Sequence, residues 1–172
     1  MTHKGRDYIR YPRYKYFFMK NITDIISPNL ICDLRAETKD EVLVELCNLS
    51  ADAPGMVNAS GFLKAIKGSE KVMSTGLGMG IAIPHARTSS VSDFIIAIGR
   101  TRKGIDFESL DGTPVYLIIL LGAPVGKRDD FLKLVAKIGS LFINQDFIQQ
   151  FLDAKSPQEM YDLLVKNYNN NV

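Results

Sequence analysis

Histidine and cysteine are scarce in this chain of 172 residues, and tryptophan is absent. The two cysteines, Cys32 and Cys47, have neither the spacing of a zinc or redox motif nor the number that a disulfide framework needs. We expect both to be small, buried apolar side chains of a protein in a reducing, cytoplasmic compartment. No apolar run approaches the roughly 18 residues that a membrane-spanning helix requires, so no transmembrane segment is predicted.

The charged residues are unevenly distributed along the chain. Residues 1–20 carry six basic side chains and one acidic one, a net charge of +5, which leaves −3 for the remainder. This arm also contains His3 and four of the seven tyrosines. Further along, Arg100, Arg102 and Lys103 form a short basic cluster, which we expect in a solvated loop.

The basic, aromatic arm could bind nucleic acid or an anionic membrane surface. It lacks the apolar core of a signal peptide. Because chain ends are disordered unless they are held in place, we expect instead a disordered extension over residues 1–19, ahead of one folded domain over residues 20–172, and no nucleic-acid partner. Met19 offers an alternative start, which would leave residues 1–18 untranslated.

The rest of the chain alternates between strand and helix patterns. Thr38-Lys39-Asp40-Glu41 and Ser156-Pro157-Gln158-Glu159 are capping boxes, each followed by apolar residues at helical spacing. Runs rich in isoleucine, valine and leucine are typical of buried strands. Together the patterns predict strands near 30–34, 80–83, 94–98 and 115–121, and helices near 22–26, 39–50, 58–69, from 128, at 147–152 and from 157. They predict an α/β fold, a single α/β/α sandwich with a central mixed β-sheet flanked by helices.

His85 is the most informative residue, because it follows a glycine-rich segment, an apolar strand pattern and a proline. An apolar strand that ends in Pro-His places the imidazole at the edge of a sheet, on a backbone with little freedom. Several interpretations remain open. The ring could simply pack, with both nitrogens satisfied. A zinc site would need three or four ligands, and no second histidine or cysteine pair supplies them. A Ser-His-Asp hydrolase would show a Gly-x-Ser-x-Gly turn, which is absent.

The remaining interpretation is that the imidazole is itself a nucleophile and forms a phosphohistidine. This chemistry needs one exposed, unprotonated ring nitrogen, a fixed acceptor for the other, and amides and a cation facing the phosphoryl oxygens. Arg87 could supply the cation, and Thr75 and Gly78 are further candidates for phosphoryl contact. No metal or cofactor is required. Asp93, Asp106 and Asp111 could orient the ring, although we favour turn or strand-end roles for them.

The segment Ser74-Thr75-Gly76-Leu77-Gly78-Met79-Gly80-Ile81-Ala82-Ile83-Pro84-His85 closely resembles the phosphorylation-site segment of fructose/mannitol-type enzyme IIA domains of the bacterial phosphotransferase system. Among these it looks most like the nitrogen-regulatory branch. The resemblance covers about residues 20–168 and continues through 104–107, 110–115 and the helix containing Phe131. It implies a domain that accepts a phosphoryl group from the phosphocarrier HPr on His85. The group then passes to a IIB domain, or the phosphorylation state is itself the signal.

The chain departs from this family at two positions. Phe131 stands where the family often has a second active-site histidine, and Ser69 stands where it usually has an arginine. Both family residues would contact or orient the phosphoryl group, and Lys71 or Arg87 could compensate. Two hypotheses follow. The protein is a working phosphotransferase component with a phosphohistidine intermediate, or it is a degenerate IIA-like regulatory binding module with little or no phosphotransfer.

Overall fold

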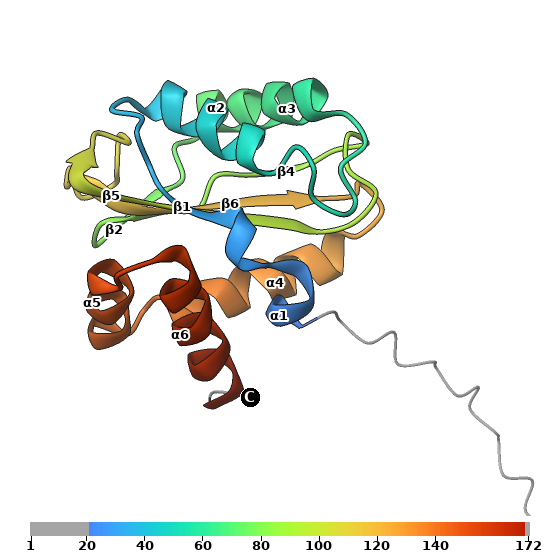
Figure 1. Cartoon of the computed structure of the whole chain (residues 1–172). Helices are drawn as coiled ribbons and strands as arrows, with labels where there is room; N and C mark the ends of the chain where they lie inside the picture. The colour runs from blue at the N-terminus through green and yellow to red at the C-terminus, as the bar shows by residue number, and fades with distance from the viewer. Residues whose placement is uncertain (1–20, 171–172) are drawn as a thin grey trace, which may run out of the picture.

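The computed structural model describes residues 21–170, so the predictions for residues 1–19 lie outside the described part of the chain. A central sheet separates two helical layers (Figure 1). In chain order the elements are α1 (Ile22–Ile25), the short 3₁₀ helix η1 (Pro28–Leu30), β1 (Ile31–Asp33), α2 (Lys39–Leu49), α3 (Ala59–Val72), β2 (Gly76–Gly78), β3 (Ile81–Ala82), β4 (His85–Arg87), β5 (Ile95–Ile105), β6 (Val115–Ala123), α4 (Arg128–Leu141), α5 (Gln145–Asp153) and α6 (Pro157–Asn170).

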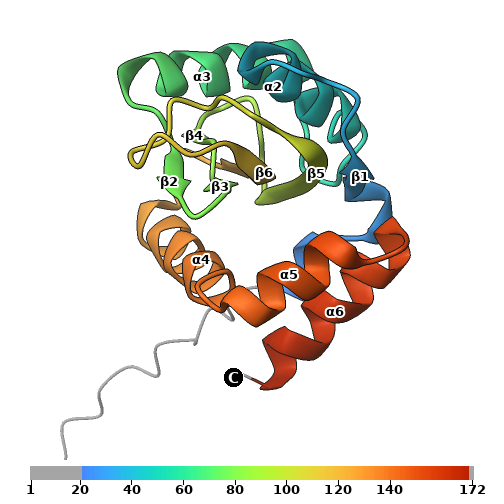
Figure 2. The same cartoon turned by 90° about the vertical axis from the view of Figure 1, so that its left-hand side faces the viewer.

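The sheet is mixed, with strand order β1-β5-β6-β3-β2. The two long strands β5 and β6 are antiparallel and form its centre, while β1 runs parallel to β5. β3 and β4 both run parallel to β6, one after the other along the same strand. Helices α2 and α3 cover one face, and α1, α4, α5 and α6 lie on the other (Figures 1 and 2). The predicted α/β/α sandwich with a mixed sheet is therefore confirmed.

Helices α2 and α3 begin where the sequence provides side-chain caps. The Glu41 amide donates to the Thr38 hydroxyl at 3.3 Å, and the Thr38 amide donates to the Glu41 carboxylate at 3.2 Å, which completes the predicted capping box of α2. Asn58 caps α3 by accepting from the Gly61 amide at 3.0 Å. These local bonds set the start of α2 and of α3, and the buried apolar face of each of these helices holds it on the sheet.

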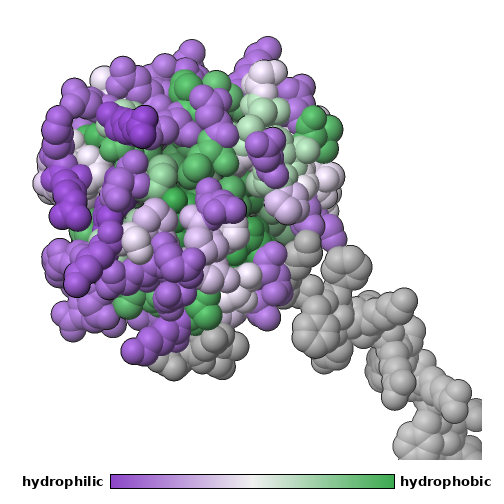
Figure 3. Space-filling view, viewed as in Figure 1, coloured by the Kyte–Doolittle hydropathy of each residue, from purple (hydrophilic) through white to green (hydrophobic). Residues whose placement is uncertain are grey.

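The core lies on both faces of β5 and β6, so these strands are apolar along most of their length. Ile119 of β6 faces the layer that contains Ile138 of α4. Gly122 faces α3 instead, where a Cβ atom would lie 2.8 Å from the Phe62 ring. Figure 3 shows hydrophilic residues over most of one face of the molecule and hydrophobic residues toward its centre, between the helical layers.

The cysteines are both free thiols. Cys47 is buried as predicted, whereas Cys32 is only partly buried, because it lies on the short edge strand β1. Burial raises the pKa of both thiols to about 12, so neither is a thiolate nucleophile near neutral pH.

Arg100 corrects the prediction of a solvated loop at residues 100–103, which instead belong to β5. Its side chain is 1% exposed, and its Nε donates to Asp33 Oδ1 of β1 at 2.7 Å. Its Nη1 donates to the backbone carbonyls of Leu152 at 2.9 Å and Ala154 at 2.6 Å. The guanidinium therefore joins two strands to the carboxyl end of α5. The sequence pattern did not reveal this, because a single buried arginine in a basic run carries no periodic signal.

Candidate functional site

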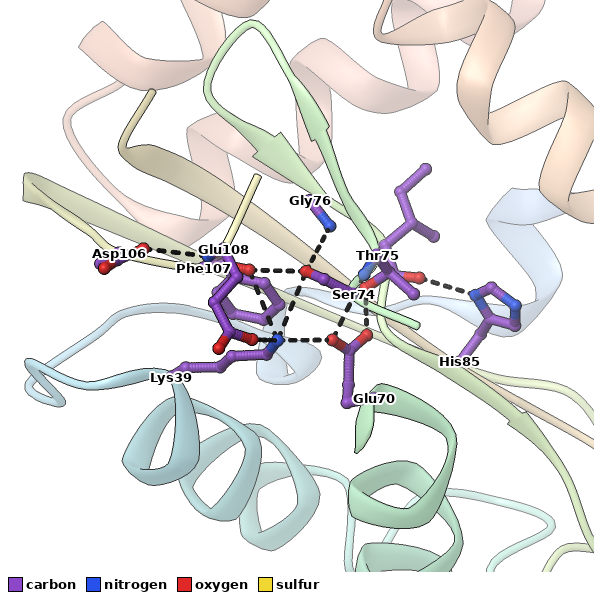
Figure 4. A network of polar contacts seen from close by, with 10 residues as sticks. Lys39, Glu70, Ser74, Thr75, Gly76, His85, Asp106, Phe107 and Glu108 are labelled. Atoms are coloured by element: carbon purple, nitrogen blue, oxygen red, sulfur yellow. Dashed lines mark hydrogen bonds and ion pairs between the residues drawn. The ribbon is translucent and has the colours of Figure 1, made fainter. Parts of the chain in front are cut away.

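His85 is the first residue of β4, next to Leu121 of β6, and its ring points toward α4. The ring is partly buried, and its Nδ1 lies 2.7 Å from the Ile83 carbonyl oxygen (Figure 4). A carbonyl oxygen can only accept, so this contact places the hydrogen of the neutral ring on Nδ1. The unprotonated nitrogen is then Nε2.

The Ile83 peptide that holds Nδ1 lies at the break between β3 and β4. The Ile83 amide donates to the Thr75 carbonyl at 3.1 Å, and the Leu121 amide donates to the Pro84 carbonyl at 2.9 Å. The break therefore turns one carbonyl toward the imidazole while its neighbours stay hydrogen-bonded to the sheet. Pro84, which has no amide hydrogen, suits this interruption of the ladder.

Glu70, near the end of α3, accepts hydrogen bonds from both donor groups of Thr75. The Thr75 hydroxyl and its backbone amide both donate to the Glu70 carboxylate. The Glu70 side chain is 3% exposed, and Lys39 Nζ lies 3.1 Å from its Oε2. Because both donors of Thr75 are used by Glu70, direct phosphoryl contact by Thr75, which the sequence predicted, is not what this geometry favours.

Lys39, the first residue of α2, gathers several acceptors around its ammonium group. It donates to Glu108 Oε2 at 2.8 Å, to Ser74 Oγ at 3.3 Å and to the Phe107 carbonyl at 3.4 Å, besides its ion pair with Glu70 (Figure 4). Burial acts to lower the pKa of Lys39, but the hydrogen bonds that its ammonium group donates to Glu108 and Glu70 outweigh burial and raise that pKa above its ordinary value. Lys39 is therefore a fixed positive charge beside the segment that leads to His85.

The β2–β3 hairpin has an unusual tip. Gly78, Met79 and Gly80 all have positive φ, at 89°, 54° and 79°. Asp111 holds this tip, because its Oδ2 accepts from the Met79 amide at 3.0 Å, and a Cβ at Gly78 would lie 2.7 Å from the same oxygen. Hydrogen bonds from Thr113 and from the Met79 amide lower the pKa of the Asp111 carboxyl. Gly78 is thus required by close packing at the tip.

The three aspartates that could have oriented the imidazole have other hydrogen-bond partners. Asp111 binds Met79, Asp106 accepts from the Glu108 amide at 2.9 Å, and Asp93 accepts from the Phe94 amide at 2.8 Å. The one hydrogen bond of the His85 side chain within residues 21–170 goes to Ile83. The turn and strand-end interpretation is the one that these contacts support.

The two positions that depart from the family lie on α4 and α3. Phe131, in the first turn of α4, is 5% exposed, and its ring centroid is 5.5 Å from that of His85, at an interplanar angle of 48°. Ser69 directly precedes Glu70 on α3. Arg87 is exposed and shares a face of β4 with His85, whereas Lys71 lines a cavity of about 370 Å³ together with Lys39 and Glu70.

The Lys39–Glu70 pair is the part of the site that the sequence prediction missed. The signal was present on α3, because Glu70 follows Ile66 by four residues and Phe62 by eight, and both of these are buried. A carboxylate on the apolar stripe of a helix is buried and requires a partner. That pattern would have identified Glu70, although not the partner that α2 supplies.

Residues 21–170 contain no helix with both the length and the apolar composition to cross a bilayer. In the same range there is no group of three or more histidine, cysteine or acidic side chains placed to hold a metal ion.

Solved structures define the class of this fold. The nitrogen regulatory protein IIA-Ntr from Neisseria meningitidis superposes with a TM-score of 0.77 and 28% identity, covering 83% of this chain and 98% of that one. IIA mannitol from Escherichia coli has the same fold, with a TM-score of 0.69 and 20% identity over 81% of this chain and 98% of that one. The α/β sandwich with His85 at a strand break is thus an enzyme IIA-type domain.

The sequence comparisons identify the family. A sequence model described as "Phosphoenolpyruvate-dependent sugar phosphotransferase system, EIIA 2" matches residues 25–167. A nitrogen regulatory protein of Bradyrhizobium diazoefficiens is 34% identical over 144 residues, 83% of this chain and 94% of that protein. The fructose-specific EIIABC component of Bacillus subtilis is 32% identical over 83% of this chain, which spans only 23% of that protein. The chain belongs to the EIIA 2 family of the phosphotransferase system, which confirms the predicted family.

Proposed function

We propose that the protein is a phosphoryl carrier in which His85 Nε2 is the nucleophile. The observation that carries this proposal is the 2.7 Å contact between His85 Nδ1 and the Ile83 carbonyl, which leaves the Nε2 lone pair free. The imidazole is partly exposed at the start of β4, so a partner protein can reach it. The proposed donor is an HPr-like phosphocarrier protein, and the proposed acceptor is a IIB domain or a regulated target, in the cytoplasm.

The transfer is a displacement at phosphorus. The Nε2 lone pair forms the bond to phosphorus as the bond between phosphorus and the donor breaks, and the Nδ1 proton stays hydrogen-bonded to Ile83. The same carbonyl favours the protonated form of the phosphorylated ring, because that form donates to it. A protonated imidazole is the better leaving group, so one hydrogen bond assists both uptake and release. Arg87, on the same face of β4, is the proposed cation for the phosphoryl oxygens.

A second candidate function is a regulatory module of the same fold with little phosphotransfer. The observation that favours it is Phe131, which lies against the imidazole and has no proton to donate. A hydrogen bond to a charged group contributes about 1.5–3 kcal/mol, so its loss would slow transfer by roughly one to two orders of magnitude.

Phosphoryl uptake from a purified system tests the proposal. The protein is mixed with HPr, enzyme I and phosphoenolpyruvate, and acid-labile phosphate on the chain is followed by intact mass. We expect one phosphate on the wild type and on His3→Ala, and none on His85→Ala. An unphosphorylated wild type beside fully phosphorylated HPr would contradict the carrier proposal and favour the regulatory module.

A further inference from the structure

We propose that the buried Lys39–Glu70 pair is a positioning device for His85, which holds the Ile83 carbonyl against Nδ1 and thereby sets which ring nitrogen reacts. The inference rests on the proposed function, because it assigns residues that prepare the nucleophile. Neither residue touches the imidazole, so both act through the backbone between them and His85.

The connection is a continuous series of contacts (Figure 4). Lys39 Nζ pairs with Glu70 at 3.1 Å, and Glu70 accepts from the hydroxyl and the amide of Thr75. The Thr75 carbonyl accepts from the Ile83 amide at 3.1 Å, and the Ile83 carbonyl accepts from His85 Nδ1 at 2.7 Å. Thr75 and Ile83 are thus each held through both the backbone amide and the backbone carbonyl.

The backbone that approaches His85 needs such support. β2 has three residues and β3 has two, and Gly76, Gly78 and Gly80 occur at every second position. Glycine carries no side chain to pack and has wide conformational freedom, so this hairpin has little rigidity of its own. Lys39 and Glu70, in contrast, belong to α2 and α3, which pack on the sheet. The pair therefore fixes the start of β2 to two helices that are themselves held on the sheet.

Stability alone does not account for this ion pair. The side chains of Glu70 and Lys39 are 3% and 18% exposed. Replacing a buried ion pair by apolar residues is often neutral or stabilising, because removing two charges from water is costly. Lys39 is also held by Glu108, a non-glycine residue with a φ of 55°. The bonds of the pair converge on Ser74 and Thr75, the residues that lead into the His85 segment.

Loosening the pair has a specific chemical consequence. Without the Glu70 carboxylate, the amide and the hydroxyl of Thr75 no longer have two acceptor oxygens, and the Ile83 carbonyl is free to move away from Nδ1. The neutral ring then populates the tautomer with hydrogen on Nε2, which is not nucleophilic at that atom. Phosphoryl uptake falls even where the fold is retained.

The molecule offers a matched control. Lys67 and Asp40 form a second lysine–carboxylate pair between α3 and α2, at 2.7 Å, with side chains that are 29% and 74% exposed. Lys67 lines the same cavity as Lys39 and Glu70. The hydrogen bond of the Lys67 ammonium within residues 21–170 goes to Asp40 and not to residues 74–83. Lys67→Met therefore removes a lysine at the same helix pair without touching the path to His85.

The experiment measures the tautomer and the rate separately. Ring ¹⁵N chemical shifts of His85 are recorded against pH in unphosphorylated wild type, Glu70→Gln, Lys39→Met, Lys39→Arg and Lys67→Met, and uptake from phosphorylated HPr is timed in each. Glu70→Gln and Lys39→Met should raise the Nε2–H tautomer and slow uptake about tenfold, a change that corresponds to one lost hydrogen bond to a charged group. Lys39→Arg should recover most of the rate, and Lys67→Met should match wild type.

Thr75→Val, which removes only the hydroxyl, gives a milder test if the charged-site variants unfold, and it should shift the tautomer in the same direction. Wild-type tautomer and wild-type rate in folded Glu70→Gln and Thr75→Val would overturn the inference. So would an equal effect of Lys67→Met. The ¹⁵N shifts need no phosphate, so an unphosphorylated wild type would reject the carrier proposal while the positioning of the ring is still measured.

Discussion

Arg100 and Glu70 are the buried charged side chains of residues 21–170, and each belongs to a polar cluster whose hydrogen bonds go to a different place. Arg100 donates to Asp33 and to the carbonyls at the end of α5, so it joins the sheet to a helical layer. The Lys39–Glu70 pair binds Ser74 and Thr75, at the start of the segment that carries His85. Burial of a charge does not by itself mark a functional site. The residues that accept or donate its hydrogen bonds distinguish the structural cluster around Arg100 from the Lys39–Glu70 cluster beside the site.

The largest predicted effect is the loss of stability when Arg100 is replaced. Arg100→Met leaves the helix-end carbonyls without their donor, and we expect the free energy of unfolding to fall by about 3 kcal/mol. Urea unfolding measures this loss, with Arg102→Met on the same strand as the exposed control. Phosphoryl uptake per folded molecule should be unchanged, and a tenfold loss of uptake in the folded protein would show that the two clusters are not separate.

A substitution at Phe131 tests the site beside the other cluster, at the imidazole itself. Phe131→His places a proton donor against His85, and we expect phosphoryl uptake to accelerate about tenfold because a hydrogen bond to the transferring group becomes possible. The reaction is timed by quenched-flow sampling and intact mass. Phe131→Leu is the control, since it removes the ring contact and adds no donor. An equal gain in both variants would assign the effect to lost packing.

Asp111 gives the smallest predicted effect, because it holds only the hairpin tip. Asp111→Ala should increase amide exchange at Met79 about fivefold, as expected for one lost hydrogen bond, with little change at Ile83. The pKa of Asp111 is lowered in the folded protein. The stability that its carboxylate contributes is therefore fully present above the ordinary pKa of 3.8 and is lost as the pH falls through the lowered pKa of the folded state. Protection of Met79, measured by hydrogen exchange and corrected for intrinsic rates, should therefore decrease in acid in wild type and stay flat in the variant.

Periodic patterns predicted the parts of the fold that depend on repeated contacts. The strands near Ile95 and Val115 and the capped helices at Lys39 and Pro157 are where the patterns placed them. The strands appear as continuous apolar runs because both of their faces are buried, and the helices repeat an apolar residue every three to four positions. β2 escaped prediction because its Gly-Leu-Gly sequence has no apolar alternation, and it forms only where β3 is available to pair.

The sequence predicted only those parts of the candidate site that a local motif or a family position marks. His85 stood out through a local motif, and Phe131 through a family position, so both were candidates from the sequence alone. Glu70 and Lys39 are 31 positions apart in the chain and meet only after two helices pack. The polar contact between them is a tertiary property, and no spacing rule within either helix specifies it.

The acceptor for His85 Nδ1 is a backbone oxygen, and this affects how the protein can evolve. Every replacement of Ile83 keeps a carbonyl at that position, so a substitution there does not remove the acceptor itself. Weakening the acceptor itself requires chemical synthesis, for example an ester or a thioamide at the bond to Pro84. A side chain that contacts the ring, such as Phe131, can therefore be exchanged while the backbone acceptor of the histidine is retained.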